Sequence, residues 1–143
     1  CSSLKSISLP MSLKTMGEGA LKGTGLRTIE IPKSVFWLGD GLLADCQSME
    51  RVTIPENIGK IPDRMFEGCT NLKKVELHEK LGVIGERAFF GCSSLDFIVI
   101  PDSVKQIGQD AFTNTDKQFI IQCSFGSYAE EYARKNKFKY QLV

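Results

Sequence analysis

Cys92-Ser-Ser-Leu95-Asp-Phe-Ile98-Val-Ile100-Pro101-Asp-Ser-Val104-Lys-Gln-Ile107-Gly108-Gln-Asp-Ala111-Phe112 is the fullest copy of a phrase that recurs along the whole chain. The phrase has spacings of 22, 23, 23 and 23 residues, and its five copies begin at Leu4, Leu26, Met49, Leu72 and Leu95. A fixed period of this length is typical of a solenoid, in which each repeat packs on its neighbours. Residues that recur at one register therefore build the stack, and function is expected where the copies differ.

Each copy predicts a short strand, a turn, a second short segment and another turn. Apolar residues alternate with polar ones at the end of the phrase, which predicts a strand with its apolar side inward. The inward pairs are Ile7/Leu9, Ile29/Ile31, Val52/Ile54, Val75/Leu77 and Ile98/Ile100. A second apolar group follows, then a residue expected to turn the chain, which is Gly17, Gly39, Pro62, Gly85 or Gly108. Pairs such as Ala88-Phe89 are then expected to fill the interior on the far side.

These patterns predict an α/β solenoid with a parallel sheet on one face and a C-terminal capping helix. We expect a right-handed leucine-rich repeat superhelix of about six coils of 22–23 residues. The whole chain, 1–143, is interpreted as one domain, with repeats at about 1–23, 24–45, 46–68, 69–91 and 92–114, a degenerate copy at 115–126 and a cap at 127–143. Because the sequence opens inside a repeat, we expect the C-terminal part of a longer array.

The predicted cap consists of a helix and a strand. Ser127 and Glu130 fit a capping box at the start of a helix near 127–137, in which the glutamate reaches back to the backbone of the first cap residue. Phe138, Tyr140 and Leu142 then alternate, which predicts a terminal strand.

The copies resemble the BspA-like leucine-rich repeats, whose signature is close to C-x-x-L-x-x-I-x-I-P-x-x-V-x-x-I-G-x-x-A-F-x-G. The match is clear from Cys69 to Gly91 and again from Cys92, and the ending that starts at Gly126 is similar to the usual terminus of that family. The second copy departs from the signature, with Gly23-Thr24-Gly25 and Leu42-Leu43. The resemblance implies a leucine-rich repeat protein at the cell surface or outside the cell, several relatives of which are adhesins for host proteins.

Composition narrows the partner class. The chain has 18 basic and 17 acidic residues, so its net charge of +1 gives no general attraction to nucleic acid. No apolar run approaches the length of about 18 residues that a membrane span requires. No signal peptide is visible. We expect a protein partner, with host extracellular or cell-surface proteins as candidates, and neither nucleic-acid binding nor membrane insertion.

The cysteines allow three interpretations. Cys46, Cys69 and Cys92 recur at one register, so they are expected to be buried free thiols that fill space between coils. A disulfide between stacked coils is the second interpretation, since neighbouring Cα atoms lie within bridging distance. Side chains that point in parallel directions are, however, poorly oriented to form one. A metal site is the third, but no C-x-x-C pair exists. Cys1 is either a repeat cysteine, two periods before Cys46, or the lipidated start of a lipoprotein. We predict no metal and no cofactor.

His78 is the one residue that raises the question of catalysis. It replaces the proline that ends the other strands, and Glu76 on the same strand could serve as its partner. A tolerated exposed substitution is the simpler interpretation. The sequence has no nucleophile motif and no phosphate loop, so we do not expect an enzyme.

The candidate binding residues lie where the copies differ. Phe36-Trp37 stands where other copies carry mostly polar residues, so it is either a binding anchor or a packing compensation for the irregular second copy. On the outward side of the sheet, Phe97, Val99 and Ile120 are expected to form an apolar patch, with Phe119 beside it. The alternatives are that the C-terminal tail covers this patch, or that two copies associate through it. The predicted protein-binding residues are Arg51, Lys74, Glu76, Phe97, Val99, Ile120, Trp37 and Phe36.

A second function class stays open from the sequence. The array could be a structural stalk that only spaces another domain from the cell and has no ligand of its own.

Overall fold

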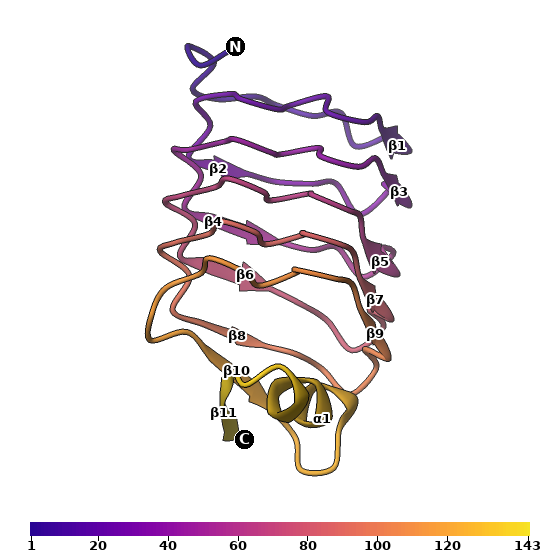
Figure 1. The fold of residues 1–143 in the computed structure, drawn as a ribbon. Helices are drawn as coiled ribbons and strands as arrows, with labels where there is room; N and C mark the ends of the chain where they lie inside the picture. The colour runs from indigo at the N-terminus through magenta and orange to yellow at the C-terminus, as the bar shows by residue number, and fades with distance from the viewer.

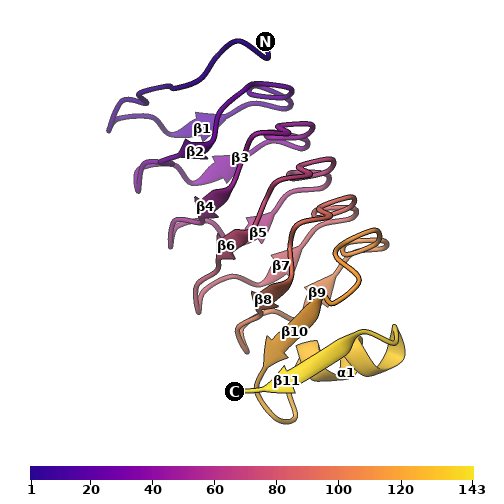
Figure 2. The same cartoon turned by 90° about the vertical axis from the view of Figure 1, so that its left-hand side faces the viewer.

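The computed structural model describes all residues, 1–143, and shows coils stacked in sequence order. Each coil lies directly on the previous one, and the last coil carries the helix (Figures 1 and 2). Every strand pair is parallel. The predicted solenoid with a parallel sheet and a C-terminal helix is therefore confirmed.

The predicted strands form the first ladder. It consists of β2 (Thr28–Ile29), β4 (Arg51–Thr53), β6 (Lys74–Glu76), β8 (Phe97–Val99), β10 (Ile120–Cys123) and β11 (Lys139–Leu142). Val52 pairs with Val75, and Ile98 pairs with Ile121, so each buried side chain stacks on the equivalent residue of the next coil. The predicted inward register is confirmed from the second copy onward. In the first copy the phrase forms no strand, and Ile7 is 39% exposed because its coil lies at the open end of the stack.

A second ladder of strands lies on another side of the coils, where the sequence predicted only an unassigned segment. It consists of β1 (Thr15–Met16), β3 (Trp37–Leu38), β5 (Lys60–Ile61), β7 (Val83–Ile84) and β9 (Gln106–Ile107). Each of these strands has two residues, an outward one followed by a buried one. An alternation of two residues is too short to be recognised in a sequence, so the prediction of a single sheet face was incomplete.

Each ladder is interrupted once. The first ladder divides into the sheets β2-β4-β6 and β8-β10-β11, and the second divides into β1-β3 and β5-β7-β9. Proline explains part of the second interruption. Gly39, Gly85 and Gly108 each donate an amide hydrogen to the coil before at 2.8 Å, whereas Pro62 at the same register has none to donate.

Three of the recurring glycines, Gly39, Gly85 and Gly108, serve close packing between coils, which corrects the expectation that they turn the chain. An added Cβ at Gly85 would lie 2.7 Å from the Asp63 nitrogen, and one at Gly108 would lie 2.6 Å from the Glu86 Cα. Real Cβ atoms do not approach backbone so closely, so only glycine lets these coils touch. The left-handed turns fall at other positions, which include Gly41, Gly68, Gly91 and Arg64.

The interior contains an aromatic stack, at the positions where pairs such as Ala88-Phe89 were expected to fill the space. The rings of Phe66, Phe89, Phe112 and Phe119 follow one another with centroid distances of 5.2 Å at each step. Phe138 packs edge-on against the last two rings, at 6.2 and 5.9 Å. The stack therefore runs through the repeats and ends under the cap.

The cap begins and ends close to the predicted positions. Helix α1 (Tyr128–Lys135) has Ser127 as its N-cap, and the Ser127 hydroxyl accepts the Glu130 amide at 3.2 Å. The Glu130 carboxylate accepts the amide of Gly126 at 2.6 Å, one residue earlier than a capping box predicts. Arg134 donates to the same carboxylate, so the nearly buried Glu130 is paired on both oxygens.

Candidate functional site

The outward side of the first ladder carries two columns of side chains that continue from coil to coil. In one column Arg51 lies beside Lys74, and Phe97 lies beside Ile120. In the other, Thr53 lies beside Glu76, and Val99 lies beside Gln122. We call the outward residues Arg51, Lys74, Glu76, Phe97, Val99 and Ile120 the sheet-face surface. The structure brings these six predicted residues onto one continuous side of the molecule.

The C-terminal half of the sheet-face surface is apolar and open. Phe97 is 37% exposed, Val99 is 46% exposed and Ile120 is half-buried. Strand β11 pairs with the edge of β10, where Ile120 lies beside Lys139, so the C-terminal tail extends the sheet and leaves the patch uncovered. Phe119 does not join the patch, as had been predicted, because it is 4% exposed and stacks on Phe112.

The N-terminal half of the sheet-face surface is charged. Lys74 forms an ion pair with Glu76 at 3.3 Å, and the Thr53 hydroxyl donates to the Glu76 carboxylate at 3.3 Å. Arg51 forms no ion pair and lies beside Lys74, although like charges directly across a ladder repel each other. Arg51 therefore presents an unpaired guanidinium on this surface. It lies two strands from Phe97 and three strands from Ile120, and neighbouring strands lie roughly 4.8 Å apart.

A second ion pair borders this surface. Arg27 donates to Glu50 at 2.8 Å, and this hydrogen bond, together with the charge of Arg27, lowers the pKa of the Glu50 carboxyl. Glu50 is thereby engaged with Arg27, and the charges of Lys73 and Arg51 also lower its pKa.

The structure separates Phe36 and Trp37 from the other predicted residues. They lie on the second ladder, at the start of β3, and are 61% and 52% exposed. Neither side chain is buried, so a large part of each ring is available for contact with a ligand. A hollow of about 200 Å³ lies beside them, lined by Glu18, Phe36, Trp37, Leu38, Asp40, Ile58, Gly59, Lys60 and Pro62.

His78 has no catalytic partner in the structure. Its Nδ1 accepts the Lys80 amide at 3.1 Å, so the ring folds over its own turn. Glu76, the proposed partner, instead contacts Lys74 and Thr53. His78 is half-buried, and its Nε2 has no hydrogen-bond partner, which differs from the expected exposed substitution.

The repeat cysteines are buried free thiols, and they have a polar role that the sequence did not reveal. Each Sγ donates to a carbonyl of the previous coil: Cys46 to Leu21 at 3.1 Å, Cys69 to Leu43 at 3.1 Å and Cys92 to Phe66 at 3.2 Å. Burial raises the pKa of the Cys92 thiol to about 12. A protonated thiol is the form that can donate this hydrogen bond.

Thr24 takes the place of the repeat cysteine in the second copy. Its amide donates to Leu21 three residues earlier, as the Cys46 amide does to Leu43, and its buried hydroxyl lies 3.4 Å from Cys46 Sγ. The Gly-Thr-Gly phrase is one residue short of the repeat, which concealed this equivalence in the sequence. The Cys1 carbonyl accepts the Leu4 amide at 3.1 Å, as the Cys46 carbonyl accepts the Met49 amide at 3.1 Å, so Cys1 occupies a repeat register, and its thiol is exposed.

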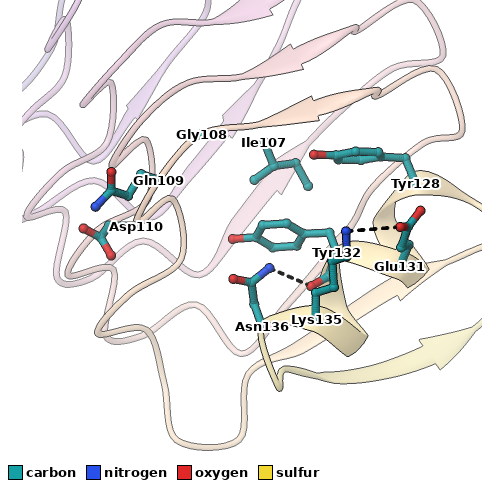
Figure 3. Close-up of a pocket in the computed structure, with 9 residues that line it drawn as sticks. All are labelled: Ile107, Gly108, Gln109, Asp110, Tyr128, Glu131, Tyr132, Lys135 and Asn136. Carbon is teal, nitrogen blue, oxygen red and sulfur yellow. Dashed lines mark hydrogen bonds and ion pairs between the residues drawn. The ribbon is translucent and has the colours of Figure 1, made fainter.

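Another hollow lies between the cap and the last coil (Figure 3). Its volume is about 340 Å³, and Tyr128 and Tyr132 of α1 face Ile107 across it. The helix already uses the polar groups at its rim, because Lys135 pairs with Glu131 at 3.4 Å and Asn136 donates to the Tyr132 carbonyl. Burial raises the pKa of the Tyr132 hydroxyl to about 12. These features fit a packed cap.

The comparisons with known proteins identify the family. The sequence profile described as the BspA type leucine-rich repeat region (6 copies) matches residues 1–118. The chain belongs to the BspA-type leucine-rich repeat family. A comparison with curated proteins gave no match.

Three solved structures resemble this BspA-type chain. A leucine-rich repeat protein from Bacteroides ovatus has a TM-score of 0.79 and 28% identity, over 99% of this chain and 40% of that one. A leucine rich cell surface protein from Faecalibacterium prausnitzii has a TM-score of 0.77 and 28% identity, over 87% of this chain and 33% of that one. A T. pallidum leucine-rich repeat protein has a TM-score of 0.72 and 28% identity, over 77% of this chain and 52% of that one. The chain spans between a third and about half of the lengths of these proteins.

The one helix of this BspA-type chain, α1, is neither long enough nor apolar enough to cross a membrane.

Proposed function

We propose that this chain is a non-catalytic protein-binding module of a cell-surface or secreted protein, and that it binds its partner through the sheet-face surface. The observation that carries the proposal is the open apolar patch of Phe97, Val99 and Ile120, with Arg51, which forms no ion pair, about two to three strands away on the same face. Protein interfaces combine a desolvated apolar anchor with charges that steer the approach. The surface location is supported by the relative from Faecalibacterium prausnitzii, which is described as a cell surface protein.

The charge of the surface indicates the chemistry of the partner. Arg51 forms no ion pair and lies beside Lys74, so a carboxylate from the partner would relieve the repulsion between these two charges. The apolar patch would accept an aliphatic or aromatic side chain of the same partner. We therefore expect a protein that presents acidic and apolar residues together, and host extracellular or cell-surface proteins are the first class to test.

The experiment compares the chain with two variants. Binding to a panel of purified extracellular matrix proteins and to host cells is measured first for the unaltered chain. Phe97→Ala should weaken binding by about 1–3 kcal/mol, the range for an aromatic anchor at an interface. Because Phe97 lies outside the core, the melting temperature should fall far less than for a core phenylalanine. Thr28→Ala, on the same column at the far end of the ladder, is the matched control and should bind normally.

Three outcomes contradict the proposal. Normal binding by Phe97→Ala moves the contact away from the sheet-face surface. Dimers of the unaltered chain that become monomers in Phe97→Ala would assign the patch to self-association. Absence of binding to any partner favours the second candidate function, a structural spacer, which the continuous stacking of the coils also supports.

A further inference from the structure

We propose that the interruption between β3 and β5 forms a binding site for a neutral sugar ring, with Trp37 as the stacking platform. The site lies on the second ladder, so it is separate from the sheet-face surface and does not depend on the protein-binding role proposed for that surface. Figure 1 shows the second ladder along one side of the stack, with β3 and β5 as successive strands.

The first observation is a backbone hydrogen bond that is missing between two neighbouring coils. At the register of Phe36, the second, fourth and fifth coils each donate an amide hydrogen to the coil before: Phe36 to Lys14, Gly82 to Gly59 and Lys105 to Gly82, all at 2.9 Å. The equivalent bond from the Gly59 amide to the Phe36 carbonyl is absent. Pro62 also has no amide hydrogen to offer β3, and no strand pairing joins β3 to β5.

The missing hydrogen bond leaves two polar backbone groups available. The Phe36 carbonyl and the Gly59 amide make no hydrogen bond within the protein. Backbone groups in folded proteins almost always have a partner, so these two must bond to water or to a ligand. The first ladder is also interrupted, between β6 and β8, but the hollow beside the exposed pair Phe36-Trp37 lies at the interruption of the second ladder.

A hollow with mixed chemistry is the second observation. The space of about 200 Å³ is lined by the buried apolar residues Leu38, Ile58 and Pro62 and by the exposed Trp37. Its rim carries Glu18, Asp40 and Lys60. The Asp40 carboxylate accepts the Asp63 amide at 3.1 Å, which holds it in place. Sites for drug-sized ligands have volumes of roughly 300–1,000 Å³, so this one has room for a single ring.

The combination fits a sugar better than a protein side chain. A pyranose ring has one apolar face of C–H groups, which can stack on an indole, and a belt of hydroxyls that both donate and accept hydrogen bonds. The carboxylates would accept from hydroxyls, the Lys60 ammonium would donate, and the free carbonyl and amide offer one partner of each kind. Acidic and basic groups are mixed at the rim, which favours a neutral ligand over a strongly charged one.

The glycines at this register supply a matched pair of variants. An added Cβ at Gly59 would meet no atom within 4 Å, so Gly59→Ala should fold normally while placing a methyl group in the hollow. An added Cβ at Gly82 would make only an ordinary contact, 3.7 Å from the Gly59 carbonyl oxygen. Gly82 lies one coil further along and does not line the hollow. Gly82→Ala is therefore the control for any general effect of the substitution.

The test uses Trp37, the single tryptophan of the chain, as its own reporter. Methyl glycosides of glucose, galactose, mannose and N-acetylglucosamine, and their short oligomers, are titrated while tryptophan emission and two-dimensional amide NMR spectra are recorded. At least one sugar should change the Trp37 emission saturably and shift the Gly59 amide resonance while the Gly82 resonance stays in place. Gly59→Ala should weaken this binding by about tenfold or more, equivalent to about 1.4 kcal/mol, and Gly82→Ala should leave it unchanged.

The proposal is overturned by several results. No saturable change with any sugar at millimolar concentration removes the site. Equal binding by the chain and by Gly59→Ala places the sugar elsewhere. Trp37 emission that responds to a short peptide panel and to no sugar would assign the aromatic pair to a protein partner.

Discussion

Replacing Phe89 with alanine removes the middle ring of the aromatic stack. Phe89 is fully buried, and its ring centroid lies 5.2 Å from those of both Phe66 and Phe112. Burial of such a side chain stabilises the folded state by about 1.5–3 kcal/mol, and each aromatic pair adds about 0.5–1.5 kcal/mol. The free energy of unfolding should therefore fall by about 3–5 kcal/mol, the range found for Phe→Ala changes in cores.

Urea denaturation, followed by circular dichroism and by Trp37 emission, measures this effect. Phe89 and Trp37 lie in different repeats, so the two signals also test whether the coils unfold together, as neighbour-to-neighbour packing predicts. The matched control is Phe90→Ala. Phe90 is half-buried, and its ring lies under the Arg87 guanidinium at 3.8 Å, a contact worth about 0.5–1 kcal/mol at an exposed site.

Two results would refute this reasoning. A loss below about 1.5 kcal/mol for Phe89→Ala, or a loss equal to that of Phe90→Ala, would show that the aromatic stack is not a main source of stability. A shift of the circular dichroism transition without any shift of the Trp37 transition would show that the coils are only weakly coupled.

Three further predictions concern the packing between coils. Gly108→Ala should lower the free energy of unfolding, measured by urea denaturation, by about 1–3 kcal/mol, because the added Cβ would push against the Glu86 backbone. An unchanged free energy of unfolding would show that the coils separate easily. Arg64 has a left-handed backbone, with φ of 57°, so Arg64→Gly should raise the melting temperature through a gain of about 0.5–1 kcal/mol, and a lower melting temperature would contradict this. Burial raises the pKa of the Cys92 thiol from an ordinary value of 9.0 to about 12, so the unfolded chain loses this proton first. Stability should therefore be fully present below about pH 9 and decline as the pH rises toward 12, and Cys92→Ala should weaken this decline; identical pH profiles would exclude Cys92 as a source.

The sequence predicted which side chains of the candidate site point outward, but not which other segments cover them. Alternation placed Phe97 and Val99 outward, because successive residues of a strand point to opposite faces. Whether they remain uncovered depended on the C-terminal tail, and the pairing of β11 with the edge of β10 decided this. Phe119 shows the limit of such patterns, because the aromatic stack, a contact with Phe112, holds it inside.

The sequence by itself determined the solenoid, the order of its coils, the inward register of the first ladder and the capping helix. These features depend on short-range periodicity and on local capping residues, which one chain segment carries alone. Only the tertiary structure decided the second ladder and the role of the recurring glycines. It also decided that Thr24 occupies the register of the repeat cysteines and that the hydrogen bond between Phe36 and Gly59 is missing. Each of these is set by the spacing between one coil and the next, which brings together residues about 23 positions apart and leaves no trace in either segment alone.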